Sequence, residues 1–421
     1  MRKFKKLFTL TFMLIVGSML LTACGSNAAK DKDNTAAEDN KILSESYNDY
    51  VNQAKGSTVT FYGWGGSDLT NSYIDNYIGK IMKNKYNITV KRVPMDTEEI
   101  INNLQSSVQS GEDKSNIDVM WVNGENFYAA MKNNLLFGPF VDKLPNIDKY
   151  VNKDADDIKY DFGYETKGYE APFGKAQLVM IYNSDKVKPV TSADNLMQQA
   201  KANPGKFTYP ALPDFTGSAF VRNIIYEKVG YDKLKDIDPN DEEAVKKAIQ
   251  PAMDYLKELK PYLWKEGKSY PADVTQQDNM FADGTLYFDV SYNPNFAANM
   301  IEKGTFPKST KTSLFDNGTI GNTHFLAIAK NAPNKAGAML LINEIESYQG
   351  QLEKYKPEVW GDLPVIDNSK LSDQEKNEIE SLKLPEATIP QSELMTKRIP
   401  ELPSALVPVI EKIWMEEIPE N

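Results

Sequence analysis

Three β-prone segments alternate with three helix-like segments early in the chain, and this alternation constrains the fold more than any other feature. The β-prone segments are residues 57–61, 88–93 and 117–122, and apolar residues at helical spacing follow each one. Such alternation predicts a parallel sheet with helices on its faces. Ligands of parallel sheets bind beyond the carboxyl ends of the strands. Those ends are predicted at Gly63–Asp68 and Asn123–Asn126.

A second α/β region follows, so the chain is predicted to fold as two lobes. Its 421 residues exceed what a single compact core usually holds. Residues 207–211 and 285–290 are β-prone. The sequence also predicts three helices in this region. The first is capped by Asp214–Ser218 and ends at Gly230, and the second begins at Asp241 and is interrupted by Pro251. The third is capped by Asn293, has Pro294 in its first turn and ends at Gly304.

Two segments are predicted to cross between the lobes. They are Tyr169–Tyr182 and Thr319–Ile328, which are β-prone and broken by glycine. A chain that leaves one lobe and returns forms a hinge, and the groove between the lobes can then open and close. From Pro333 onward the pattern is mostly helical.

The chain holds one cysteine and one histidine, and these counts exclude several kinds of chemistry. An intramolecular disulfide and a Cys/His zinc site are excluded. Catalysis by a Ser-His-Asp triad would depend on His324 alone, which lies in a predicted crossing strand where a core histidine is the more common case. The net charge of −11 argues against a nucleic-acid partner.

The first 24 residues have the pattern of an export signal. Four basic residues precede an apolar run from Leu7 to Leu21, which is too short for a spanning helix. The run ends in Leu21-Thr22-Ala23-Cys24-Gly25, which resembles the lipobox of bacterial lipoproteins; a plain secretory signal with a chance cysteine is the alternative. The resemblance implies cleavage before Cys24 and its lipidation. Removal of residues 1–23 would change the net charge to −15.

Residues 24–46 are predicted to be a flexible tether because they contain few large apolar residues. The anchor and tether, with the two lobes, resemble the solute-binding proteins of ABC importers. The body resembles a family labelled thiamine-transport substrate-binding proteins, whose relatives bind thiamine, polyamines or iron. The matching stretches are GWGGS (63–67), DVMWVNGENFYAAMKNNLLFGPFVDKLPN (118–146), EAPFGKAQLVMIYNS (170–184), FTYPALPDFTGSAF (207–220) and WGDLPVID (360–367).

This resemblance implies a type II periplasmic-binding-protein fold, in which two α/β lobes are joined by crossing hinge strands. It also implies no catalysis and delivery of a solute to a membrane permease with its ATPase. We therefore expect a monomer that is lipid-anchored on the outer face of the cytoplasmic membrane. The expected regions are a signal peptide (1–23), a tether (24–46), the first part of lobe 1 (47–170), lobe 2 (171–322), and a return to lobe 1 with a C-terminal helical region (323–421).

Aromatic residues at predicted strand ends, hinge and loops are candidates for holding a flat or cationic ligand. They are Trp64, Trp121, Phe173, Tyr292 and, on the C-terminal loop, Trp360. Acidic residues lie beside them and would favour an amine, a thiazolium or a zwitterion: Asp68, Glu125, Asp214 and, within a strand, Asp289. The alternatives are that the aromatics pack the lobe edges and that the acids cap helices.

Backbone N–H groups and hydroxyls at the predicted helix starts leave anion binding open as a second interpretation. The remaining candidate ligand-binding residues belong to these loops: Gly65, Gly66, Ser67, Asn123, Asn126, Phe215, Thr216, Ser218 and Asn293. No arginine lies in the loops, and Arg222 lies one turn further on. A sugar or ferric iron is a further alternative, although no Tyr-Tyr pair occurs.

A hydrolase that uses two carboxylates, such as Glu125 and Asp289, is the alternative from another class. The sequence contains no G-x-S-x-G, no HExxH and no phosphate-binding loop with lysine. We therefore predict a transport protein without catalysis, cofactor or metal. Its expected ligand is an organic cation or zwitterion of thiamine type.

Overall fold

The computed structural model describes residues 37–418. The predicted signal peptide, Cys24 and most of the predicted tether lie outside the described residues. The chain divides into two compact units, Met1–Ile42 and Leu43–Asn421. The described residues of the first unit, 37–42, are helical. All elements named below belong to the second unit.

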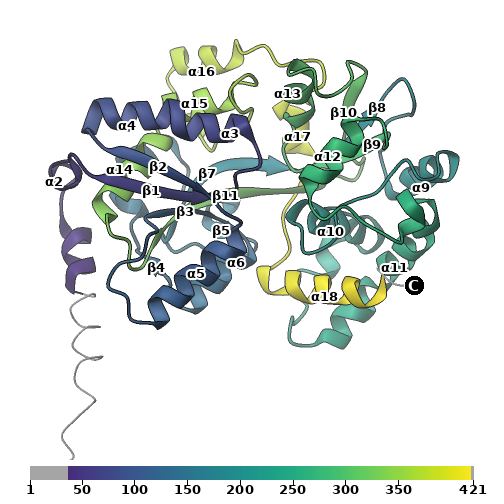
Figure 1. Ribbon diagram of the computed structural model, residues 1–421, viewed down its shortest axis with the longest axis horizontal. Helices are drawn as coiled ribbons and strands as arrows, with labels where there is room; N and C mark the ends of the chain where they lie inside the picture. Colours follow the sequence, from purple (N-terminus) through teal and green to yellow (C-terminus); the bar gives the residue numbers. More distant parts are fainter. Residues whose placement is uncertain (1–36, 419–421) are drawn as a thin grey trace, which may run out of the picture. The chain divides into compact units, whose positions relative to one another are not determined.

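The first lobe is built on the predicted parallel strands. Strands β1 (Thr58–Gly63), β2 (Thr89–Pro94) and β3 (Val119–Val122) lie in the order β3-β1-β2, and β1 pairs in parallel with both neighbours. The helices after them are α3 (Asp68–Ser72), continued by a π-helical turn (Tyr73–Ile78) and α4 (Gly79–Tyr86), then α5 (Thr97–Gln109) and α6 (Glu125–Lys132). The alternation predicted from the sequence is confirmed (Figure 1).

The second lobe is built on an antiparallel sheet in the order β10-β8-β9. Its strands are β8 (Val179–Asn183), β9 (Phe288–Ser291) and β10 (Thr310–Ser313). Five helices belong to this lobe: α9 (Ala193–Ala202), α10 (Phe215–Val229), α11 (Glu242–Leu259), α12 (Val274–Ala282) and α13 (Phe296–Glu302).

Three local predictions in this lobe are wrong. Residues 207–211 form no strand; they are largely buried, but Pro210 has no N–H for a ladder, and the carbonyl of Phe207 instead accepts from the N–H of Trp264 at 2.8 Å. Helix α11 runs through Pro251, because the carbonyl that proline leaves unpaired belongs to Lys247 on the exposed side. Helix α13 begins at Phe296, later than predicted.

Strands β7 (Glu170–Gln177) and β11 (Thr319–Ala329) run side by side in the same seven-stranded sheet as β1, β2 and β3, and they extend from it towards the second lobe (Figure 1). β7 leads directly into β8 of the second lobe, and β11 pairs with β3 of the first lobe. All of β11 is buried, His324 included. The two predicted crossing segments are therefore confirmed as a pair of strands.

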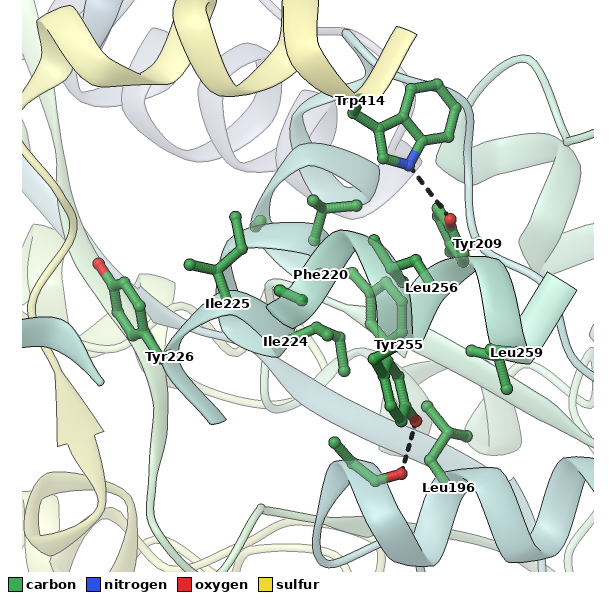
Figure 2. Packing of buried hydrophobic residues seen from close by; sticks show 14 of the residues in the cluster. Leu196, Tyr209, Phe220, Ile224, Ile225, Tyr226, Tyr255, Leu256, Leu259 and Trp414 are labelled. Carbon is green, nitrogen blue, oxygen red and sulfur yellow. Dashed lines mark hydrogen bonds between the residues drawn. The ribbon is translucent and has the colours of Figure 1, made fainter. Parts of the chain in front are cut away.

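The C-terminal part contributes to both lobes. Helix α18 (Val407–Glu417) packs on α10 and α11, and the indole Nε1 of Trp414 donates to the Tyr209 hydroxyl at 3.2 Å (Figure 2). The remaining elements are α2 (Tyr47–Ala54), β4 (Leu136–Phe137), α7 (Pro145–Tyr150), α8 (Asp156–Lys159), β5 (Tyr160–Asp161), β6 (Tyr164–Glu165), α14 (Lys335–Ile345), α15 (Tyr348–Tyr355), α16 (Asp373–Glu380), α17 (Gln391–Thr396), β12 (Arg398–Ile399) and six short 3-10 helices. Within residues 37–418, none of the helices has the length and apolar character needed to cross a membrane.

Candidate functional site

Three of the predicted aromatics form one cluster with the only histidine. The rings of Trp121 and Phe173 lie 5.4 Å apart, and Trp360 lies 5.6 Å from Trp121 and 5.3 Å from Phe173. The ring of His324 lies 5.0 Å from that of Trp121 and is tilted by 37° against it. We call these four residues the aromatic cluster. Since Phe173 is fully buried and Trp360 is 5% exposed, both have the packing role that the sequence left open for them.

A buried charge network supports the aromatic cluster. The Nε2 of His324 lies 3.0 Å from the Oδ2 of Asp362, and the Nζ of Lys354 lies 2.5 Å from the same oxygen. Burial lowers the pKa of Lys354, and Asp362 offsets only part of this shift. Burial opposes ionisation of Asp362, but His324 and Lys354 together lower its pKa. The loop that carries Trp360 is tied to the second lobe, because the Nδ2 of Asn299 donates to the Trp360 carbonyl at 2.7 Å.

Trp64 lies on the loop that follows β1 and is 38% exposed. Its indole covers Gly66 so closely that a Cβ at that position would collide with the ring. The Ser67 hydroxyl accepts the N–H of Thr70 at 3.4 Å and caps α3, and Asp68 occupies the first turn of that helix. The loop therefore presents a single large aromatic surface to solvent, next to the end of a parallel strand.

The N-terminal end of α10 brings together the candidates of the second lobe. Asp214 caps the helix, since its carboxylate accepts the N–H of Gly217 at 2.8 Å and that of Val274 at 3.1 Å. Burial raises the pKa of this carboxyl, although these backbone hydrogen bonds oppose the shift. The ring of Phe215 lies 5.2 Å from that of Tyr292. The capping role that the sequence gives as the alternative for Asp214 is the one the structure shows.

Behind this helix end lies a buried cluster of charged and hydroxyl groups, which we call the arginine cluster. The guanidinium of Arg222 donates to both carboxylate oxygens of Glu401, at 2.9 and 3.0 Å, and to the Ser218 hydroxyl at 2.5 Å. The Tyr292 hydroxyl donates to Glu401 at 2.7 Å, and Ser218 donates to Glu411 at 2.6 Å. The ion pair of Arg222 and Glu401 joins α10 to the segment that follows β12.

Glu125 connects the first lobe to this cluster. It lies at the start of α6, directly after β3, and the N–H of Gly124 before it donates to Asp161 at 2.5 Å. Burial raises the pKa of Glu125 to about 7; Arg222 opposes the shift, and Glu401 and Glu411 add to it. The neighbouring Asn126 donates to Glu125 at 3.3 Å, and Asn123 is half-buried at the strand end. Glu125 is a predicted site residue of the first lobe, and Arg222 of α10, which was not among the predicted site residues, acts on its pKa from the second lobe.

This raised pKa predicts a pH-dependent stability. Between pH 4.5 and 7 the unfolded chain releases the Glu125 proton while the folded chain keeps it, so stability should fall by about 3 kcal/mol as the pH rises through this window. Glu125→Gln should lack this part of the slope and be more stable than the wild type at pH 8. Chemical denaturation from pH 4.5 to 8 measures both, with Glu99→Gln, an exposed carboxyl, as the control. Parallel pH profiles for the wild type and Glu125→Gln would contradict the assignment.

The remaining candidates lie elsewhere or are structural. Asp289 is buried on β9 beside Asp278. Burial raises the pKa of both carboxyls, and repulsion between the two acids adds to the rise for Asp278. Asn293 is half-buried and accepts the N–H of Asn295 at 2.9 Å in the turn after β9. Among residues 37–418, no group of three or more His, Cys, Asp or Glu side chains is placed to hold a metal ion.

The structure also brings charged residues into the hinge that the sequence did not single out. Lys175 of β7 pairs with Asp157 at 2.7 Å, and Arg398 of β12 lies 4.0 Å from the same carboxylate. β12 pairs with the start of β11, residues 319–320. The only local sign of β12 in the sequence is the β-branched Ile399 beside Arg398, and a single β-branched residue does not identify a strand. A pairing partner almost eighty positions away cannot be read from the sequence.

Residues 76–382 match the family described as bacterial extracellular solute-binding protein. The chain is 37% identical over 333 residues to Protein YnjB of Escherichia coli (strain K12), which covers 78% of this chain and 85% of that protein. Its fold is similar to the periplasmic binding protein AfuA of Actinobacillus pleuropneumoniae with bound fructose-6-phosphate (TM-score 0.60, 15% identity, 86% of this chain and 98% of that chain). It is also similar to a candidate spermidine/putrescine ABC transporter protein of Listeria monocytogenes (TM-score 0.60, 17% identity, 85% and 98%). These two likenesses concern the fold alone, and they confirm the predicted fold class.

Proposed function

This chain belongs to the family of bacterial extracellular solute-binding proteins, and from this membership we propose that it is the solute receptor of an ABC importer. The observation that carries the proposal is the meeting of the two lobes at the crossing strands. There Arg222 of α10 opposes the rise in the pKa of Glu125, which follows the carboxyl end of a parallel strand. A solute bound between these elements would hold the lobes closed, and the closed form would be recognised by a permease.

The proposed solute is a small organic cation or zwitterion with a flat ring, of thiamine type. Trp64 supports this class, because an exposed indole beside a strand end can stack on a ring or on a cationic group. Glu125 supports it as well, since a carboxyl with a pKa of about 7 can accept a hydrogen bond from, or pair with, an amine. The spermidine/putrescine label of the Listeria protein is compatible with an amine ligand.

A thermal-shift screen of the mature chain tests this function. The panel contains thiamine and its precursors, polyamines, amino acids, sugars, oxyanions and ferric iron. A true ligand at 100 times its Kd stabilises the folded state by about 2.7 kcal/mol, which gives a clear rise in Tm. A ring-bearing amine should give the largest rise. A chain that responds to none of these solutes would not be the proposed receptor, and one that turns a solute over would instead be an enzyme.

Trp64→Ala should weaken binding of the solute found by the screen by about 1–3 kcal/mol, because the stacking surface is lost. The exposed position of Trp64 predicts that Tm without ligand stays within about 2 °C of the wild type. Isothermal titration calorimetry measures the affinity. Tyr160→Ala removes another exposed aromatic, outside the strand-end loops, and serves as the control. Equal affinities of Trp64→Ala and the wild type would remove Trp64 from the site.

We further propose that Cys24 carries the lipid anchor and that the protein acts as a monomer beside its permease on the outer face of the cytoplasmic membrane. The support is the lipobox-like sequence Leu21–Gly25 and the single occurrence of cysteine in the chain. Mass spectrometry of the N-terminal peptide of the mature protein tests the anchor. A peptide that begins at another residue, or an unmodified Cys24, would contradict it.

A further inference from the structure

Strand register places a set of charged and polar side chains on one face of the crossing strands. Lys175 pairs with Thr323 across β7 and β11, and Arg398 pairs with Thr319 across β12 and β11. Directly paired residues project to the same face, and so do alternate residues along one strand. Arg398, Lys175 and Thr323 therefore share one face, while His324 and Trp121, which pairs with Leu326, project to the other.

The side chain of Arg398 lies across β11 at Gly321. A Cβ at Gly321 would lie 2.8 Å from the Cγ of Arg398 and 3.0 Å from its Nε, so only glycine leaves room for the arginine there. This path leads from the β12 edge of β11 towards Asp157, which lies 4.0 Å from the nearer guanidinium nitrogen. Asp157 is already bound by Lys175 at 2.7 Å. The arginine thus approaches an acid that is occupied by another cation.

The two terminal guanidinium nitrogens of Arg398 are buried and have no hydrogen-bond partner among the described residues. The Arg398 side chain is 8% exposed. The Oγ1 of Thr323, on the same face, is also buried without a partner in the described part of the chain. Buried polar atoms in folded proteins are nearly always hydrogen-bonded, so several such atoms on one face indicate a place for a bound group.

The carboxylate that Arg398 approaches is already paired. Lys175 holds Asp157 at 2.7 Å, whereas Arg398 lies 4.0 Å from it. Burial lowers the pKa of Arg398, but arginine keeps its proton in proteins, so the buried guanidinium stays positive. An anionic group could accept the hydrogen bonds that its Nη atoms do not make to described residues. The planar fork of guanidinium nitrogens suits the two oxygens of a carboxylate or phosphate group.

We propose that Arg398, together with the Thr323 hydroxyl on the same face of the strands, is an oxyanion subsite that binds the carboxylate or phosphate group of the transported solute. The proposal rests on the proposed function and narrows its ligand class from cations and zwitterions to solutes that carry an oxyanion. Because Arg398 lies on the strand that follows the second lobe and pairs with a crossing strand, a bound oxyanion would be held at the junction of the lobes.

The test uses the two anions alone as probes. Tm of the full mature chain is measured in sodium acetate, sodium phosphate and sodium chloride at equal ionic strength and pH 7. We expect acetate or phosphate to raise Tm by several degrees above chloride, and the more effective anion identifies the group that the solute carries. Arg398→Gln should lose this rise, and Arg398→Lys should keep a smaller one. Lys397→Gln, which removes the same charge from a partly exposed neighbour 3.6 Å from Asp316, should respond as the wild type does.

An equal response of the wild type and Arg398→Gln, or no rise above chloride in the wild type, overturns the subsite. A purely structural role for Arg398 predicts that Arg398→Gln lowers Tm by several degrees in chloride. The subsite predicts no loss in chloride, because the Nη atoms of Arg398 make no hydrogen bond to a described residue and the variant removes a buried charge. The thermal-shift screen of solutes separates the two proposals. If a solute without an oxyanion binds, the receptor function is supported and the subsite is contradicted. If acetate or phosphate raises Tm through Arg398 but no solute of the panel binds, the subsite is supported and the receptor function is contradicted.

Discussion

Replacing Arg222 with alanine should lower the free energy of unfolding by about 3–5 kcal/mol, because the change leaves a carboxylate buried without its cation. Glu401 is 5% exposed and receives two hydrogen bonds from Arg222, and only the Tyr292 hydroxyl would remain. The Ser218 hydroxyl loses a charged neighbour as well. Urea denaturation monitored by tryptophan fluorescence measures the loss.

Two further variants separate the buried pair from a general effect of removing arginine. Arg92→Ala removes a bidentate pair with Asp75, whose carboxylate is 42% exposed, and should cost less than about 1 kcal/mol. The double variant Arg222→Met/Glu401→Leu should recover most of the lost stability, since it leaves no charge unpaired. A loss below 1 kcal/mol in Arg222→Ala, or no recovery in the double variant, would show that Glu401 is solvated in the folded protein.

The parts of the fold that local sequence determines could be predicted. β1, β2 and β3 with their helices follow from apolar spacing over a few residues, and capping by Asp214 follows from its position before a helix. The crossing strands could be predicted because each contains a long β-prone run. In each case the signal lies within the segment itself.

The parts that depend on distant partners could not be predicted. Glu401 binds Arg222 across 179 positions, and no local pattern marks either residue. Arg398 lies in a strand of two residues whose existence depends on β11. Trp121 and Trp360 are both candidates for contact with a ligand, and the structure also joins their rings at 5.6 Å, a contact that no local pattern indicates. Exposure, which separates Trp64 from them, is a property of the assembled lobes.

Gly174 marks the point where the crossing strands and the buried charge network meet, and Gly174→Ala should destabilise the protein by about 3 kcal/mol or more. A Cβ there would lie 2.6 Å from the Nε2 of His324 and 2.6 Å from the Nζ of Lys354, and it would collide with the Oδ2 of Asp362. Lys354 is fully buried and His324 and Asp362 are about 5% exposed, so none can move into solvent. Overpacking and loss of the charge network would therefore add.

Gly79→Ala is the matched control, because it adds the same methyl group in a helix, where the nearest atom is the Ile74 carbonyl oxygen at 3.3 Å. Helix propensity favours alanine there, so the change in stability should stay within about 1 kcal/mol. Since β7 leads from one lobe into the other, Gly174→Ala should also reduce the affinity for the solute, whereas Gly79→Ala should not. If Gly174→Ala unfolds at the urea concentration of the wild type, the added methyl group must fit beside Asp362. The network of His324, Lys354 and Asp362 could not then be rigid, and a hinge held in place by it would be excluded.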